Sequence, residues 1–114
     1  MASARLKKSS QFRLVYREGE REAGRNVVVC YLRKKSAGIV PGFVASKRVG
    51  KAYQRNRAKR QMREIFQRLK ERITEKNLWI VFIASFRPGE TPFQELIEDV
   101  ESSLGRAGLI SKSG

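Results

Sequence analysis

The sequence predicts an α+β fold, a small α/β sandwich in which helices pack against one β-sheet. Segments with apolar residues three and four positions apart alternate with β-branched and aromatic segments, in the order helix, strands, long helix, strand, helix. The chain has 114 residues, enough for one hydrophobic core and too few for two. Because no repeat or low-complexity linker divides it, we expect a single domain over residues 1–114, with its core at about 5–105.

The first element is a short helix over residues 9–17. Ser9 or Ser10 can cap its start, and Gly19 ends it. Its inner face carries three apolar side chains at positions i, i+3 and i+4, namely Phe12, Val15 and Tyr16.

Two strands follow, over residues 27–32 and 39–46. Both are rich in β-branched and aromatic residues, and the polar, glycine-containing residues 33–38 between them predict a hairpin. A further short strand is expected around residues 21–23.

The longest element is a helix over residues 52–76, followed by a strand over Leu78–Ala84. The uninterrupted apolar run of the strand predicts burial on both faces. Six apolar side chains recur along one stripe of the helix: Ala58, Met62, Ile65, Phe66, Leu69 and Ile73.

A third helix follows the turn at residues 87–89. Thr91 can cap it, Pro92 can occupy its first position, and Gln94 can close a capping box. We expect it to end at Gly105, with residues 106–114 forming a disordered tail. Its inner face carries Phe93, Leu96, Ile97, Val100 and Leu104.

Charge is the unusual property of the composition. The chain has 25 Lys and Arg against 11 Asp and Glu, a net charge of +14. This charge predicts binding to a polyanion, either nucleic acid or an anionic membrane. The longest apolar run has seven residues, whereas a membrane-spanning helix needs about twenty. The basic start lacks the apolar segment of a secretory signal, and the single Cys30 cannot form an internal disulfide. We therefore expect a cytoplasmic protein with no membrane partner.

The cations gather in residues 47–63, which we call the basic window. A charge run on a helix is usually a solvated face, but such faces alternate in sign, and acids begin here only at Glu64. The window therefore favours nucleic acid, since arginine forks suit phosphate. It holds eight of the 25 cations and none of the 11 acids: Lys47, Arg48, Lys51, Arg55, Arg57, Lys59, Arg60 and Arg63.

A helical projection divides the window into two groups. Arg55 and Lys59 border the apolar stripe, while Asn56, Arg60 and Arg63 look outward.

The aromatic residues of the first helix leave two interpretations open. Phe12 and Tyr16 lie four positions apart, a spacing that is typical of a core contact. Tyr16 is less easily buried, and an aromatic ring beside basic residues can stack on an unpaired base.

Few side chains suit catalysis. The chain has no histidine, one cysteine and one aspartate, Asp99. Glu95, Glu98 and Glu101 are interpreted as a solvated face of the third helix. We therefore expect no catalytic residue and no metal site on the protein itself.

Four segments of the chain resemble the bacterial ribonuclease P protein family, whose signature is Arg-Asn-Arg. The resemblance covers residues 5 to 104 and is most specific over residues 46–64. It is carried by Arg5-Leu6-Lys7-Lys8, by Phe12 and Tyr16, by GFVASKRVGKA at residues 42–52, and by RNRAKRQMRE at residues 55–64.

The resemblance implies a fold similar to the second domain of ribosomal protein S5. That fold has a four-stranded sheet, three helices and a left-handed βαβ crossover. The general preference for right-handed crossovers would have predicted the opposite hand.

The resemblance also implies partners and a division of labour. The partners are the ribonuclease P RNA and precursor tRNA, with no DNA expected, and hydrolysis belongs to the RNA with Mg²⁺ of the holoenzyme. The residues that would face the RNA subunit are Lys47, Arg48, Lys51, Asn56, Arg57, Arg60 and Arg63. The residues that would line a cleft for the 5′ leader are Phe12, Tyr16, Val28, Cys30, Arg55 and Lys59. Family members often carry an aromatic residue at the position of Cys30.

Two alternatives remain at this point. A ribosomal protein or general RNA chaperone would share the charge and fold type but would not prefer precursor over mature tRNA. A free-standing nuclease would need acids and bases that the chain lacks.

Overall fold

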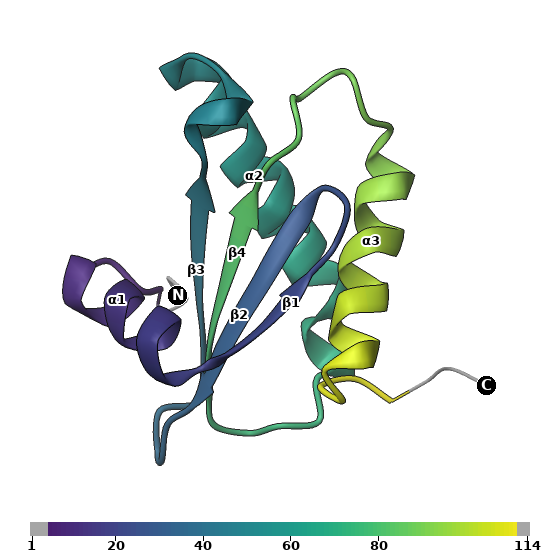
Figure 1. The fold of residues 1–114 in the computed structure, drawn as a ribbon. Helices are drawn as coiled ribbons and strands as arrows, with labels where there is room; N and C mark the ends of the chain where they lie inside the picture. Colours follow the sequence, from purple (N-terminus) through teal and green to yellow (C-terminus); the bar gives the residue numbers. More distant parts are fainter. Residues whose placement is uncertain (1–4, 112–114) are drawn as a thin grey trace.

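The computed structural model describes residues 5–111. Three helices and four strands follow one another along the chain (Figure 1), and short 3₁₀ turns at Lys47–Val49 and Lys70–Arg72 flank the second helix. The elements are α1 (Ser9–Glu18), β1 (Glu20–Ala23), β2 (Val27–Arg33), β3 (Ile39–Ala45), α2 (Ala52–Leu69), β4 (Leu78–Ala84) and α3 (Phe93–Arg106). This order confirms the α+β prediction, including the short strand expected around residues 21–23.

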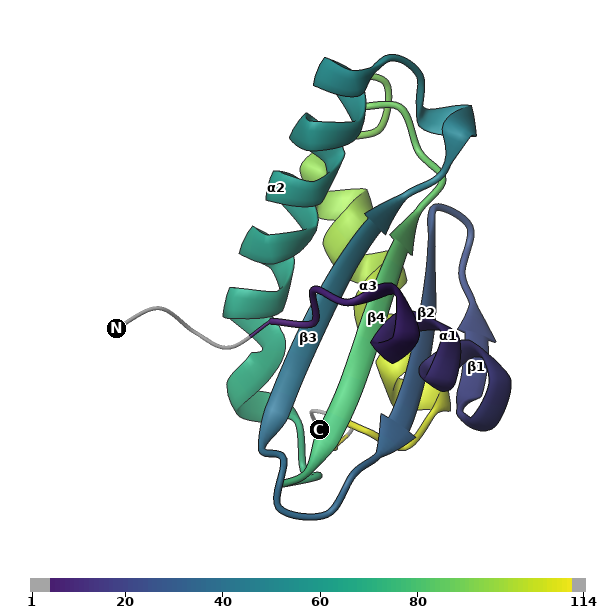
Figure 2. The ribbon, with the colours of Figure 1, turned by 90° about the vertical axis from the view of Figure 1, so that its left-hand side faces the viewer.

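The strands form one mixed sheet in the order β1-β2-β4-β3. The predicted hairpin of residues 27–32 and 39–46 was therefore wrong, because the later strand β4 inserts between β2 and β3 and pairs with both. β3 and β4 are parallel, and the other two pairs are antiparallel. In Figure 1 both β3 and β4 run upward, with β4 to the right, and Figure 2 shows that α2 lies behind the sheet in that view. The crossover is therefore left-handed, as the resemblance implies, whereas about 98% of such crossovers are right-handed.

Helices cover the two faces of the sheet unequally. α2 and α3 pack on one face, and α1 lies alone on the other (Figure 2). The alternation of β4 serves both layers, with Ile80 and Phe82 turned to α2 and α3 and Val81 turned to α1. Trp79 and Ile83 on the α1 side are only half-buried. The predicted double burial of β4 is thus complete in its middle and partial toward its ends.

The larger core lies between α2, α3 and the sheet. Phe82 stacks on Phe43 with ring centroids 5.6 Å apart, and Phe66 of α2 lies 5.8 Å from Phe82. This packing fixes the face that α2 turns inward. The buried residues of α2 confirm the predicted stripe: Ala58, Met62, Ile65, Phe66 and Leu69.

The predicted end of the long helix was wrong. α2 stops at Leu69 rather than at residue 76, and Ile73 is extended and bridges Ile110. Ile73 is nevertheless buried, with 9% of its surface exposed. Ile73 therefore belongs to the core, as its spacing from Leu69 predicted, although it lies outside the helix.

The predicted start of α1 at Ser9 is confirmed, but its predicted serine cap and the predicted start of α3 were wrong. The N-cap of α1 is Lys8, and the side-chain oxygen of Gln11 accepts the backbone N–H of Lys8 at 3.0 Å in place of a serine cap. α3 begins after Pro92 rather than after Thr91, with no side-chain cap.

The C-terminal segment is folded as far as it is described, contrary to the expected tail from residue 106. α3 passes through Gly105, and Gly108 takes a φ of +73°. The N–H of Leu109 donates to the carbonyl of Leu104 at 2.9 Å, the bond of a glycine-terminated helix end. Leu109 and Ile110 are buried, so the segment closes the core. Residues 112–114 lie outside the described residues.

Candidate nucleic-acid interface

The start of α2 is held rigidly against the end of β3. Val49 is buried in the 3₁₀ turn between them, and Gly50 takes a φ of +123°, which side chains rarely allow. The guanidinium of Arg55 donates to the carbonyl of Gly50 at 2.8 Å. The basic window is therefore displayed on a fixed turn and helix rather than on a flexible loop.

The structure brings the residues predicted to face RNA together at this end of the molecule. Arg63 is half-buried rather than fully outward, and the guanidinium of Arg57 lies beside Gly89 of the loop before α3. Of the three residues predicted to look outward, Asn56 and Arg60 do so, whereas Arg63 is partly covered. The exposed members are Lys47, Arg48, Lys51, Asn56, Arg57 and Arg60.

The two halves of α2 differ in whether their cations form ion pairs. Within residues 5–111 no cation of the basic window forms an ion pair, whereas Arg68 in the second half pairs with Glu64 at 3.2 Å. The first turn of α2 has no acid, and its N-cap, Lys51, makes no side-chain cap bond. Cations near the positive end of a helix dipole are each unfavourable by about 0.3–1 kcal/mol. A solvated face would balance these charges, so the arrangement favours an external anion.

Sequence reasoning missed Tyr53 on the first turn of α2. Tyr53 is 67% exposed, a larger fraction than that of Tyr16, the other exposed aromatic residue among those described. A helical projection places it about 20° from Arg60, on the polar side. An aromatic residue off the apolar stripe was therefore the signal that could have found it.

Three buried polar atoms near the window have no hydrogen-bond partner among the described residues. They are Ser46 Oγ, Gln54 Oε1 and Gln61 Oε1, from the end of β3 and from α2. An unsatisfied buried polar group costs about 1–3 kcal/mol. Sequence reasoning did not single them out, because their burial depends on how α2 packs.

The α1 side of the sheet forms the second part of the candidate interface. Phe12, Val28 and Cys30 belong to one apolar cluster there. A Cβ added to Gly42 would lie 2.7 Å from Cε1 of Phe12, so the Phe12 ring rests directly on the β3 backbone. Phe12 is half-buried and forms part of the wall, whereas Tyr16 is 45% exposed and remains accessible.

Cys30 and Tyr16 stay neutral at physiological pH. Burial raises the pKa of the Cys30 thiol, although Arg21 partly opposes the shift. Burial, followed by the neighbouring Cys30, raises the pKa of the Tyr16 hydroxyl. Cys30 is 3% exposed, as expected for a packing position in a strand rather than for a reactive thiol.

The predicted cleft is only partly assembled around α1. Four of its six residues lie on the α1 side: Phe12, Tyr16, Val28 and Cys30. Arg55 and Lys59 lie on α2, which packs on the opposite face of the sheet (Figure 2). The edge strand β3 stands between the two groups. The cleft residues therefore form two groups at the two sides of β3. We call Phe12 and Tyr16, with the neighbouring Val28 and Cys30, the aromatic group, and Arg55 and Lys59 the cationic group.

Comparison with known proteins decides the family. Residues 1–108 match the family model described as Ribonuclease P. The chain belongs to the ribonuclease P protein family. The ribonuclease P protein component of Symbiobacterium thermophilum is 40% identical over 112 residues, which span 96% of each sequence.

Solved ribonuclease P proteins share the fold. The Staphylococcus aureus protein superposes with a TM-score of 0.82 at 28% identity, over 96% of this chain and 100% of that one. The Thermotoga maritima protein gives a TM-score of 0.77 at 30% identity, over 91% and 97% of the two chains.

Family membership confirms the predicted function at the level of the complex. A ribonuclease P protein is an RNA-binding subunit of an endoribonuclease that processes tRNA. In the described part of the chain, no helix is both long and apolar enough to cross a membrane.

Proposed function

We propose that this ribonuclease P protein binds the RNA subunit through the start of α2 and the 5′ leader of precursor tRNA on the α1 side of the sheet. The observation that supports it best is the absence of ion pairs throughout the basic window within residues 5–111. RNA phosphates would neutralise these cations and release counterions on binding. The contacting residues would be Lys47, Arg48, Lys51, Asn56, Arg57, Arg60 and Arg63.

The leader would lie across β3, between the aromatic and cationic groups. Tyr16 offers an exposed ring for stacking, and its raised pKa keeps the hydroxyl uncharged beside phosphates. Val28 and Cys30 supply an apolar floor. Cys30 has no ring, so it cannot stack on a base of the leader as an aromatic residue would. Arg55 and Lys59 would hold the leader phosphates at the far side of β3.

Hydrolysis would belong to the RNA subunit and its Mg²⁺ ions. The single aspartate is occupied, because the Asp99 carboxylate accepts the backbone N–H groups of Arg25, Asn26 and Val27 at 2.8 to 3.1 Å. Within residues 5–111 no three carboxylate, histidine or cysteine side chains lie close enough to share a metal ion. No step of the proposal therefore runs through a metal on the protein.

Reconstitution with a bacterial ribonuclease P RNA tests the proposal. We expect the protein to lower the Mg²⁺ concentration needed for cleavage, since its cations screen phosphate repulsion, and to raise affinity for precursor tRNA over mature tRNA. Tyr16→Ala should weaken precursor binding by about 1–3 kcal/mol and leave mature tRNA unchanged.

Arg25→Ala is the matched control, because Arg25 is exposed and only its backbone is bonded to Asp99. An unshifted Mg²⁺ titration with equal affinity for both tRNAs would contradict the proposal and leave a general RNA-binding protein. Cleavage by protein free of RNA would instead indicate a protein nuclease.

A further inference from the structure

α1 packs on its face of the sheet against β2, β4 and β1, and a second groove lies on the side of the helix away from Tyr16. Leu14 and Tyr16 are two positions apart, which places them on opposite flanks of the helix. The groove on the Leu14 flank encloses about 400 Å³. Its lining is Ser10, Gln11, Arg13, Leu14, Arg17 and Trp79, and we call it the Trp79 groove.

Trp79 is the only tryptophan of the chain and is only half-buried. The ammonium of Lys34 lies 4.9 Å from its ring centroid, a cation–π contact. A cation–π contact at a partly exposed site contributes only about 0.5–1 kcal/mol, so a flat ligand can exchange with the Lys34 ammonium. The indole packs on one side against the apolar cluster under α1, and its remaining exposed surface is open to such a ligand.

The cations of the groove are accessible. Arg13 is exposed and forms no ion pair within residues 5–111. Arg17 pairs with Glu18 at 3.3 Å, but both side chains are more than half exposed, so the pair contributes little and can exchange. Among the residues that the structure describes, no acid lines the groove.

The backbone position of Lys34 is set by the connection between β2 and β3. The side-chain oxygen of Asn77 accepts the backbone N–H of Gly38 at 2.9 Å, which ties this connection to the start of β4 beside Trp79. Ala37 donates to the carbonyl of Lys34 at 3.2 Å and closes the turn. The backbone of Lys34 is therefore held near Trp79, while its long side chain can move off the ring.

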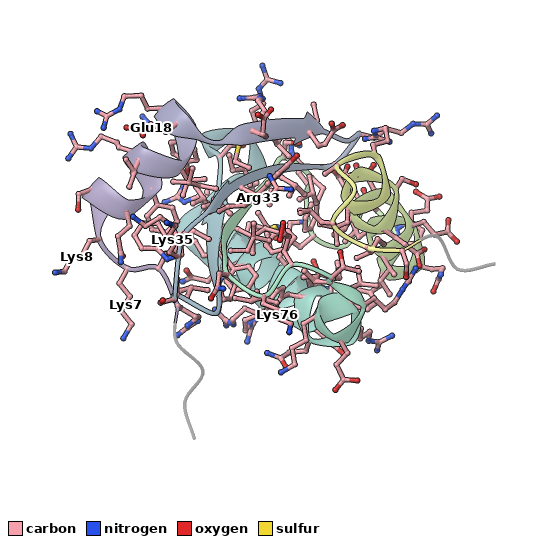
Figure 3. The ribbon with its side chains drawn as sticks, turned by 90° about the horizontal axis from the view of Figure 1, so that it is seen from below. Lys7, Lys8, Glu18, Arg33, Lys35 and Lys76 are labelled. Atoms are coloured by element: carbon pink, nitrogen blue, oxygen red, sulfur yellow. The ribbon has the colours of Figure 1, made fainter. Side chains whose placement is uncertain are left out.

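Further cations surround this end of the molecule. Figure 3 labels Lys7 and Lys8 just before α1, Lys35 in the connection between β2 and β3, and Lys76 in the loop before β4. A polyanion that follows this end meets positive charge from three separate segments. The charge complementarity and the aromatic floor together fit single-stranded nucleic acid better than a small anion.

We propose that the Trp79 groove binds one unpaired nucleotide of RNA, with the base stacked on the indole and the flanking phosphates held by Arg13, Arg17 and the displaced Lys34. The inference that the ligand is RNA rests on the proposed function. The site itself is separate, because α1 stands between it and Tyr16. A bound RNA would thus be held on both flanks of α1.

Tryptophan fluorescence tests the proposal directly, since Trp79 is the sole source. The probe is single-stranded hexauridylate carrying a terminal dye, so that anisotropy reports binding and Trp79 emission reports stacking. In Tyr16→Ala, which lacks the exposed ring of the leader site, we expect emission to be quenched with the same midpoint as the anisotropy change. Arg13→Glu should raise that midpoint by about fivefold or more, whereas Arg25→Glu, an equal charge change at an exposed site, should raise it far less.

Two further variants separate this groove from the leader site and from misfolding. Tyr16→Ala should leave the quenching of Trp79 intact. Trp79→Leu should weaken binding by anisotropy, and Trp79→Phe, which keeps an aromatic ring, should restore most of it. Absence of binding, binding without quenching, equal effects of Arg13→Glu and Arg25→Glu, or loss of quenching in Tyr16→Ala would each overturn the proposal. None of these outcomes alters the reconstitution assay that tests the proposed function.

Discussion

Replacing Arg57 and Arg60 together by alanine removes two cations from the basic window without touching the core. Both side chains are exposed and neither forms an ion pair within residues 5–111, so folding should be unaffected. Each phosphate contact adds about 0.7–0.9 to the slope of log K against log salt, so the double variant should flatten the slope by about 1.4–1.8. Between 0.1 and 0.4 M salt, its affinity for the RNA subunit should therefore fall by a factor about 7 to 12 smaller than that of the wild type.

The assay is RNA-subunit binding across a salt series, with thermal unfolding measured in parallel. The control variant, Arg25→Ala with Arg68→Ala, loses the same two charges outside the window. An unchanged slope in the Arg57 and Arg60 variant, or an equal change in the control, would refute the reasoning and make the window a solvated face.

Four further changes probe the rest of the structure. Gly42→Ala should displace the ring of Phe12, whose Cε1 lies 2.7 Å from the added Cβ, and cost about 1–3 kcal/mol in thermal unfolding together with leader affinity. Asp99→Asn should cost about 1.5–3 kcal/mol in urea unfolding, because its carboxylate accepts three backbone N–H groups. Burial raises the pKa of Cys30 above its ordinary 9.0, so the unfolded thiol ionises first and stability falls as pH rises past that value. Cys30→Val should lose less stability between pH 8 and pH 10, and equal losses would contradict this. Tyr53→Ala should weaken RNA binding by about 1–3 kcal/mol at unchanged stability, and equal affinity would leave Tyr53 a surface residue.

Side-chain periodicity predicted the inner faces of the elements because spacing alone decides which residues share a face. The stripe from Ala58 to Leu69 is buried as expected, and β4 alternates between the two layers. These features depend only on local geometry.

Element ends could not be predicted because distant residues decide them. Ile73 continues the helical spacing but pairs with Ile110, which belongs to the segment expected to be a tail. No residue near Ile73 or Ile110 in the sequence predicts this pairing. Similarly, Gln11 rather than a serine satisfies the start of α1.

The positive charge of the candidate site could be predicted from the sequence, but the spatial arrangement of its residues could not. The deficit of acids identified the basic window from composition alone. Which face each helix covers depends on the hand of the crossover, and this placed Arg55 and Lys59 across β3 from Tyr16. The resemblance supplied the hand, but the separation of the two groups emerged only from the structure.

The two sides of α2 explain why its start can violate the usual preferences of a helix. Lys51 offers no side-chain cap, and cations occupy a turn where acids would be favoured. Its inner face compensates, because each large buried apolar side chain contributes roughly 1.5–3 kcal/mol, and α2 buries four of them: Met62, Ile65, Phe66 and Leu69. Packing therefore holds the helix in place, and the residues of its outer face are not needed for folding. For this reason substitutions on the outer face should change binding and its salt dependence, whereas those on the inner face should change stability first.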